Sequence, residues 1–254
     1  MKKQILFAVL LLVSMSAAAQ EWDHEYRPFV EEGKHWNYIH DVAVIGGPKE
    51  YNYLYSYVLK GDSLINDIPC KKIYKERDEK TTYMGAMYEK DAKIFLFPVN
   101  ETKEGLLYDF SLKRGETITI EISQTTILCK DIKLSTYEGI ERKIILYIPI
   151  DNSISEEDKE RILNMDDDSF PYWIEGIGSP TDLIGNIDMP GNYNHLFSCN
   201  LNGKTLFRDG YYSNIHNAVN TPFSSDNLFD LQGRPLSTPP SRGMYIQNGK
   251  KVIK

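Results

Sequence analysis

The sequence predicts an all-β protein, in which an antiparallel meander forms a sandwich or a partly closed barrel, with one short helix and a small β tail. Three observations support this fold class. Short runs of β-branched and aromatic residues recur along the chain, and Gly, Asn and Asp turn signals separate them at the spacing of a meander. Long crossover helices, which a parallel sheet would require, are absent from the pattern.

The first 19 residues have the pattern of a secretory signal peptide. A basic head at Lys2 and Lys3 precedes an apolar run over 5–13, and Ala17, Ala18 and Ala19 supply small residues for cleavage. The apolar run is too short to span a bilayer. We therefore expect an exported chain that does not span the membrane and that resides in the periplasm, at the cell surface or outside the cell.

The net charge of the chain argues against one class of partner. The chain has 29 basic and 36 acidic side chains, and removal of Lys2 and Lys3 leaves 27 basic ones and a net charge of −9. Nucleic acid is not an expected partner, because its phosphates would be repelled.

Cys70, Cys129 and Cys199 match no zinc spacing, so either one disulfide or three buried thiols is expected.

The body is expected over residues 20–210, followed by a linker at 211–225 and a β tail at 226–254. Asn66-Asp67 and Asn202-Gly203 predict tight hairpins, whereas Gly61-Asp62 predicts a break after the first long strand. Ser155, with Asp158 three residues later, predicts a capped helix over 155–164. The strands expected in the body cover 51–59, 63–65, 70–74, 81–89, 94–97, 106–110, 117–122, 127–135, 142–150, 172–174, 195–201 and 204–208.

The segment from Tyr172 to Ser179 is the landmark of the body. It opens as a strand with Tyr172, Trp173 and Ile174 and then carries Gly176 and Gly178, which an ordinary strand interior disfavours. Such glycines mark a bulge or the close approach of another backbone. We expect the chain to turn a corner here.

Aromatic residues give the first candidate binding site. Tyr51, Tyr53, Tyr55 and Tyr57 alternate along one strand and share a face, and Trp173 lies on the landmark strand. These rings form either an exposed stacking platform for sugars or part of the inner face of the sheet. The second interpretation is favoured, because aromatic residues are ordinary strand formers.

Acidic residues give two further candidates. Asp166, Asp167 and Asp168 are a candidate calcium site, although their spacing is not that of an EF-hand and a solvated acidic turn is favoured. Glu175 is the candidate catalytic residue, because glycoside hydrolysis needs two facing carboxyl groups and Asp182 and Asp188 are near in sequence.

Motifs of other enzyme classes are absent. The five histidines fall into no metal-ligand spacing, and no serine-hydrolase elbow precedes a helix. Phosphate loops and dinucleotide fingerprints are missing as well, so no cofactor is expected.

The tail carries a resemblance to a known class of signal. Its sequence reads Asn227-Leu-Phe-Asp230-Leu-Gln-Gly233-Arg234, then Gly243-Met-Tyr245-Ile and Lys250-Lys251-Val-Ile-Lys254. This pattern resembles the C-terminal sorting region of secreted Bacteroidetes proteins that are handled by type IX secretion. The body, with Leu107-Tyr108-Asp109-Phe110 and Trp173-Ile-Glu-Gly-Ile-Gly178-Ser179, resembles uncharacterised secreted proteins that often precede such tails.

The resemblance implies that the tail is a sorting signal that meets the secretion machinery. The tail is shorter than a full sorting domain and lacks a Pro-Asn-Pro opening, so a closing hairpin of the fold is the alternative. The residues that would carry the sorting motif are Asp230, Gly233, Arg234, Gly243, Tyr245 and Lys251.

Together these features predict a secreted or cell-surface binding module without catalytic activity, whose ligand is a glycan or a protein. Export, the tyrosine stripe and the missing catalytic motifs support this expectation. Two alternatives stay open: a carboxylate-dependent hydrolase that acts on glycans, and a structural component of the cell envelope.

Overall fold

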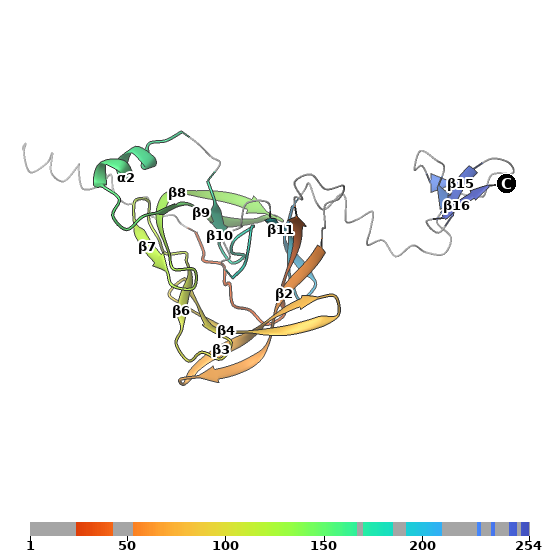
Figure 1. Ribbon diagram of the computed structural model, residues 1–254, viewed down its shortest axis with the longest axis horizontal. Helices are drawn as coiled ribbons and strands as arrows, with labels where there is room; N and C mark the ends of the chain where they lie inside the picture. Colours follow the sequence, from red (N-terminus) through yellow and green to blue (C-terminus); the bar gives the residue numbers. More distant parts are fainter. Residues whose placement is uncertain are drawn as a thin grey trace, which may run out of the picture.

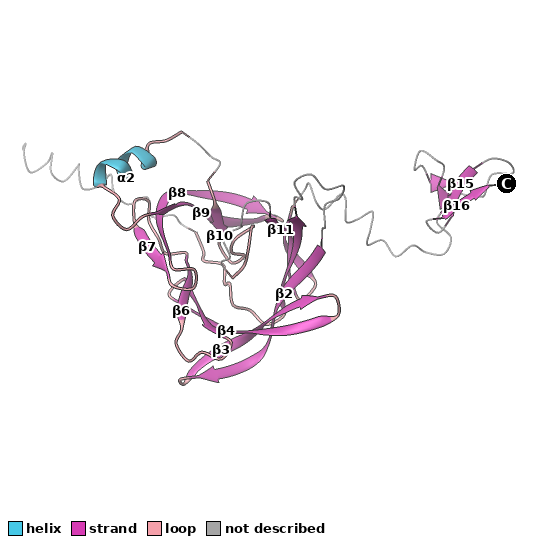
Figure 2. Cartoon of the chain, viewed as in Figure 1, coloured by secondary structure: helices cyan, strands magenta, loops and turns pink. Residues whose placement is uncertain are grey.

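Strands dominate the computed structural model, which describes residues 24–42, 53–166, 170–184 and 192–209, together with four short strands between 228 and 253. Figure 2 shows one short helix beside these strands in the described part of the chain. Neighbouring strands are antiparallel throughout the sheets. The predicted fold class is therefore confirmed.

The larger sheet has eight strands and curls into a half-barrel (Figure 1). Its first six strands in the chain form the predicted meander, because each strand pairs with the next one. Its last two strands form a hairpin that returns to the other side of the first strand. In spatial order the strands are β12 (Lys204–Arg208), β11 (Asn192–Leu201), β1 (Lys34–Val42), β2 (Tyr53–Ile65), β3 (Ile68–Arg77), β4 (Lys80–Lys90), β5 (Lys93–Pro98) and β6 (Gly105–Asp109).

A second sheet of four strands faces the open side of the half-barrel (Figure 1). It follows β6 directly, and the amide of Ile122 donates to the carbonyl of Leu106 at 3.3 Å at this junction. The helix α2 (Glu156–Leu163) lies in the chain between its last two strands. In spatial order the strands are β10 (Tyr172–Ile174), β9 (Ile140–Ile150), β8 (Thr125–Tyr137) and β7 (Thr117–Ile120).

The tight turns and the helix cap form where the sequence predicts them. Asn66 and Asp67 have φ values of 50° and 62°, the left-handed geometry of a two-residue hairpin, and Asn202 has a φ of 49° in the second predicted hairpin. Ser155 caps α2, because its Oγ accepts from the amide of Asp158 at 3.1 Å. Local sequence alone determines these features.

The break predicted at Gly61-Asp62 is wrong. Strand β2 continues to Ile65, and its register with β3 shifts between Leu59 and Asp62. Gly61 has a φ of +82°, so it supplies the bulge that lets the strand bend without ending. The amide of Gly61 donates to the carboxylate of Glu32 at 3.0 Å, which compensates for the interrupted ladder of hydrogen bonds between β2 and β3.

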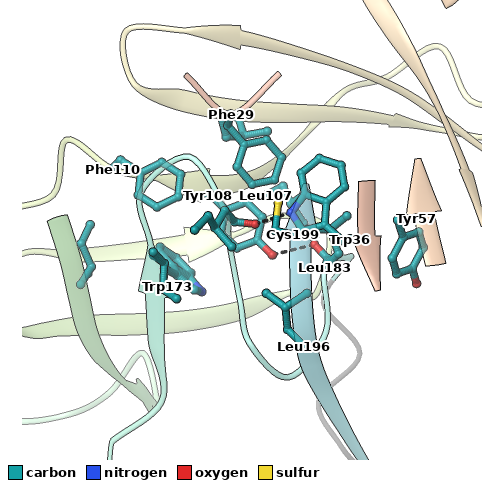
Figure 3. Close-up of a cluster of buried hydrophobic side chains, with 14 of the residues drawn as sticks. Phe29, Trp36, Tyr57, Leu107, Tyr108, Phe110, Trp173, Leu183, Leu196 and Cys199 are labelled. Carbon is teal, nitrogen blue, oxygen red and sulfur yellow. Dashed lines mark hydrogen bonds between the residues drawn. The ribbon is translucent and has the colours of Figure 1, made fainter. Parts of the chain in front are cut away.

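The core fills the space between the two sheets, and aromatic rings occupy much of it (Figure 3). Phe29, from the segment before β1, lies 5.3 Å from the ring of Tyr108 on β6. Tyr108 in turn contacts Trp173 of β10 edge to face, with ring centroids 5.2 Å apart. Strand segments far apart in sequence are therefore joined by ring packing, which adds about 0.5–1.5 kcal/mol per pair beyond area burial.

The landmark segment turns inside this core. Beyond β10 the chain folds back, so that the amide of Ile174 donates to the carbonyl of Gly178 at 2.9 Å and the amide of Gly178 donates back at 2.7 Å. Gly176 has a φ of +69°. A Cβ atom at Gly176 would lie 2.9 Å from the carbonyl oxygen of Arg27. The predicted corner and the close approach of another backbone are both present.

Side chains of β1 hold this turn in place. The indole Nε1 of Trp36 donates to the carbonyl of Ile177 at 2.7 Å, and the hydroxyl of Tyr38 donates to the carbonyl of Ser179 at 2.8 Å. Both side chains are fully buried. They satisfy carbonyl groups that a buried turn would otherwise leave unpaired, at a cost of about 1–3 kcal/mol each.

The cysteines are three free, buried thiols, one of the two predicted alternatives. Burial raises the pKa of Cys129 and of Cys199 to about 12. Each thiol therefore stays protonated at neutral pH and packs as a small apolar side chain.

The tail forms a small sheet of its own. Its strands are β13 (Leu228–Phe229), β14 (Pro235–Leu236), β15 (Met244–Gln247) and β16 (Lys250–Ile253), in the order β14-β13-β15-β16. The β tail predicted at 226–254 is therefore present as short strands. Of the residues expected to carry a sorting motif, Tyr245 pairs with Val252 and Lys251 pairs with Ile246. The others, Asp230, Gly233, Arg234 and Gly243, lie outside the described residues.

We expect Gly176→Ala to lower the free energy of unfolding by at least about 2 kcal/mol more than Gly139→Ala does. Both glycines have similar left-handed φ values, +69° and +75°, so both substitutions carry the same backbone strain. A methyl group at Gly139 meets nothing within 4 Å, whereas at Gly176 it meets two backbone carbonyls. Urea denaturation measures the difference, and equal losses for the two variants would contradict the close-approach argument.

Candidate functional site

A small pocket opens between β6 and the second sheet. Its volume is about 170 Å³, and its lining is mostly apolar. An apolar cavity of about 150 Å³ holds one benzene ring, so this pocket admits a single ring of a ligand. The residues that line it are Leu107, Tyr108, Ile120, Ser123, Thr125, Ile127, Tyr147, Pro149, Pro171, Trp173, Ser179, Thr181 and Asp182.

Two aromatic rings form one wall of the pocket. Trp173 of β10 and Tyr147 of β9 are neighbours across the second sheet, with ring centroids 4.8 Å apart. Burial raises the pKa of Tyr147 to about 12, so its hydroxyl is neutral and serves as a hydrogen-bonding group. This wall offers a flat apolar surface with a polar edge.

Hydroxyl and carboxyl groups lie on other sides of the pocket. Ser123 and Thr125 lie just before and at the start of β8, and Thr181 and Asp182 come from the segment after the landmark turn. The Oγ of Ser179 and the Oγ1 of Thr181 are hydrogen-bonded at 3.0 Å. The pocket therefore combines an aromatic wall with several groups that bind hydroxyls.

The tyrosine stripe belongs mainly to the core. Tyr55 and Tyr57 are each only 3% exposed, on the concave face of the half-barrel, and Tyr53 is partly buried at its end. This burial supports the interpretation that the stripe packs the inner face of the sheet. Tyr51 lies outside the described residues.

Two cations from β3 cover these tyrosines. The Nζ of Lys75 lies 4.1 Å from the ring centroid of Tyr55, and the Cζ of Arg77 lies 3.6 Å from that of Tyr53. Both are cation–π contacts, worth about 0.5–2 kcal/mol each according to exposure. Neither residue is recognisable as part of a site from the sequence, because their place beside the tyrosines depends on the register of β2 against β3.

Asp182 connects the two candidate regions. Asp182 lines the pocket of Trp173, and its carboxylate forms a hydrogen bond with Tyr57. Burial is the main cause that raises the pKa of Tyr57, and Asp182 raises it further. The amide of Ile184 donates to Asp182 Oδ1 at 3.1 Å. Trp173 and the stripe, independent in the sequence, thus lie on either side of one carboxylate.

Glu175 lies inside the protein rather than in the pocket. Its side chain is 1% exposed and forms an ion pair with His24, which is also buried. Its Oε2 also accepts from the amide of Lys143 at 3.2 Å, while the neighbouring Arg142 donates to the backbone carbonyl of Glu175 at 2.9 Å. These contacts tie the segment before β1 to β9 and indicate a structural role.

The candidate calcium site is only partly described. Asp166 is exposed just after α2, and Asp167 and Asp168 lie outside the described residues. In the described segments, no group of three or more His, Cys, Asp or Glu residues is arranged to hold a metal ion. The same segments contain no helix that is long and apolar enough to cross a membrane.

Comparisons with known proteins add no information about the site. No protein-family model, no curated protein and no solved structure matches the chain.

We expect Glu175→Gln to lower the free energy of unfolding by about 1–3 kcal/mol, because it removes the charge from a buried, hydrogen-bonded pair. Glu141→Gln is the matched control. Glu141 lies 3.6 Å from the other ring nitrogen of His24, but its side chain is 52% exposed, so the loss should stay below about 0.5 kcal/mol. Thermal and urea unfolding measure both effects, and equal stability of the two variants would contradict the structural role.

Proposed function

We propose that this protein is an exported binding module without catalytic activity, and that its ligand is a glycan with one sugar ring seated in the pocket of Trp173 and Tyr147. The observation that carries the proposal is the composition of the pocket. One aromatic wall faces a ring-sized space bordered by the hydroxyls of Thr125 and Thr181 and by Asp182.

A sugar ring matches these features. It presents an apolar face of C–H groups, which stacks on aromatic rings, and an edge of hydroxyl groups, which pairs with hydroxyl and carboxylate side chains. Small-molecule sites generally have mostly apolar walls and a few polar groups that set orientation. The volume of about 170 Å³ suits one ring of a longer ligand rather than a whole oligosaccharide.

The hydrolase alternative receives less support. Glycoside hydrolysis requires two carboxyl groups on opposite sides of the scissile bond. Asp182 is the one carboxylate among the described residues that line the pocket, and Asp188 lies outside the described residues. Glu175 is buried and bonded to His24 and to Lys143, where a substrate does not reach it.

Export and sorting complete the proposal. The signal peptide expected at residues 1–19 supports export. The resemblance of the tail supports sorting to the cell surface, and its strands pair with one another in a sheet of their own, as a separable unit would. A glycan-binding body would then be presented outside the cell.

The pocket is tested by filling it. We expect Thr125→Trp to weaken binding about tenfold or more, because the indole occupies the space of the sugar ring. Thr126→Trp is the matched control, since the next residue of β8 points to the opposite face of the sheet. The probe is an array of purified oligosaccharides, followed by calorimetric titration of the tightest ligand.

Two results would overturn the pocket proposal. One is a folded protein that binds nothing on a broad array and has no co-purifying partner. The other is a glycan ligand that binds the Thr125→Trp and Thr126→Trp variants equally well.

The tail is tested by intact mass spectrometry of the native protein from the cell surface, the periplasm and the medium. We expect a surface form that is shortened near Ser225, with added mass if it is attached to a glycolipid. A form that keeps Lys254 in every fraction would show that the tail belongs to the mature protein and would contradict the sorting proposal.

A further inference from the structure

We propose that the tyrosine-lined end of the half-barrel binds a negatively charged group of the glycan, a carboxylate or a sulfate ester, through Lys75 and Arg77. This inference rests on the proposed glycan-binding function and specifies the class of ligand. It predicts an acidic oligosaccharide, with one ring in the pocket of Trp173 and its anionic group on β3.

Lys75 is the central observation. It is partly buried, and its Nζ lies against the rings of Tyr55 and Tyr57, at 4.1 Å and 5.4 Å from their centroids. Neither an ion pair nor a hydrogen bond is formed by its ammonium group within the described residues. A lysine ammonium has three donors, and ring faces satisfy none of them as fully as an oxygen would.

Arg77 extends the same surface. It is two positions further along β3, so it shares the face of Lys75, and its guanidinium covers the ring of Tyr53 at 3.6 Å. Its Nε binds Asp78 at 3.0 Å, an exposed contact that leaves its other donors available. The guanidinium fork is suited to the paired oxygens of a carboxylate or sulfate.

The two cations repel each other. Burial is the main cause that lowers the pKa of Lys75, and the charge of Arg77 lowers it further, whereas Asp182 raises it. An anion that bridges the two groups would remove this repulsion, which gives the site a preference for negative charge.

Among the described residues, no acidic group neutralises Lys75 by direct contact. Asp182 raises the pKa of Lys75 through its charge, but this carboxylate is engaged by the hydroxyl of Tyr57 and the amide of Ile184. His40, which stacks on Tyr53 at 4.5 Å, binds the Oδ1 of Asn194 through Nδ1 at 2.7 Å. Neither Asp182 nor His40 forms an ion pair or a hydrogen bond with the ammonium group of Lys75.

The tyrosines make the site rigid. Tyr38 stacks on Tyr55 at 5.3 Å with an interplanar angle of 12°, and Tyr55 meets Tyr57 edge to face at 5.7 Å. This packing fixes the rings on which the cations rest, so that little side-chain entropy is lost when an anion binds. The partly buried Tyr53 and the exposed Arg77 keep the end of the row accessible.

The test uses three probes of similar length and measures binding by calorimetry. Oligogalacturonate carries carboxylates without sulfate, carrageenan oligosaccharides carry sulfate without carboxylate, and agarose oligosaccharides carry neither. We expect one or both acidic probes to bind at least about tenfold more tightly than the neutral one. The preference should weaken as salt is raised, because it is electrostatic.

Lys75→Met should reduce the affinity for the preferred acidic probe about tenfold or more and leave that for the neutral probe unchanged. The matched control is Lys72→Met, which removes the same charge from the opposite face of the same strand. Arg77→Gln gives an independent second variant, because its side chain is 48% exposed and its replacement leaves the core intact.

The outcomes separate the two proposals. Tighter binding of an acidic probe that depends on Lys75 or Arg77, but not on Lys72, confirms the inference, and the identity of that probe distinguishes carboxylate from sulfate. Binding of the neutral probe with no acidic preference overturns the inference and leaves the proposed function standing. An acidic preference unaffected by all three variants also overturns it, and a protein that binds none of the probes overturns it as well.

Discussion

The rest of the structure depends on the hydrogen bonds that the buried ammonium group of Lys34 donates. Lys34 is 0% exposed, and its Nζ donates to the carbonyls of Pro28 at 2.7 Å, Phe29 at 2.9 Å and Gly176 at 3.1 Å. Glu31 forms an ion pair with Lys34 at 2.7 Å, and burial lowers the pKa of Lys34. A charge in the interior must be surrounded by such acceptors, because an unpaired one would cost several kcal/mol. One side chain thus fixes three segments together: β1, the segment before it and the landmark turn.

The position of the landmark turn determines the position of the binding region. The segment from Ser179 to Leu183 follows the turn and crosses the concave side of the half-barrel, where the hydroxyl of Tyr108 donates to the carbonyl of Leu183 at 2.6 Å (Figure 3). Asp182 belongs to this segment. The carboxylate that joins the pocket to the tyrosine row is therefore placed by the same buried polar contacts that organise the core.

The proposed binding function follows from the chemistry of the candidate site. Aromatic rings, neutral hydroxyls and cations resting on tyrosine faces are groups that can bind and orient a ligand, and none of those described is arranged as a facing pair of acid and base. The polar groups with the most extensive buried contacts, Lys34 and Glu175, serve the fold. Buried charge stabilises the fold, whereas Lys75 and Arg77, at the accessible end of the half-barrel, have donors that bind no acceptor among the described residues.

Local sequence determined the features whose energetics are local. The Asn66-Asp67 turn, the Ser155 cap and the alternation of Tyr53, Tyr55 and Tyr57 each depend on residues within a few positions of one another, so they are readable from the chain itself. The same holds for the all-β class. Gly176 and Gly178 predicted a bulge or the close approach of another backbone, but only the tertiary structure shows that the backbone at Arg27 approaches Gly176.

Only the tertiary structure decided the rest. The return of β11 to the side of β1, the bulge at Gly61, the burial of Glu175 and the meeting of Trp173 with Tyr147 depend on contacts between distant segments. The placement of Lys75 over Tyr55 depends on which strand pairs with which, and in what register. A one-residue slip would turn every side chain to the other face, so the site exists only once the whole sheet has formed.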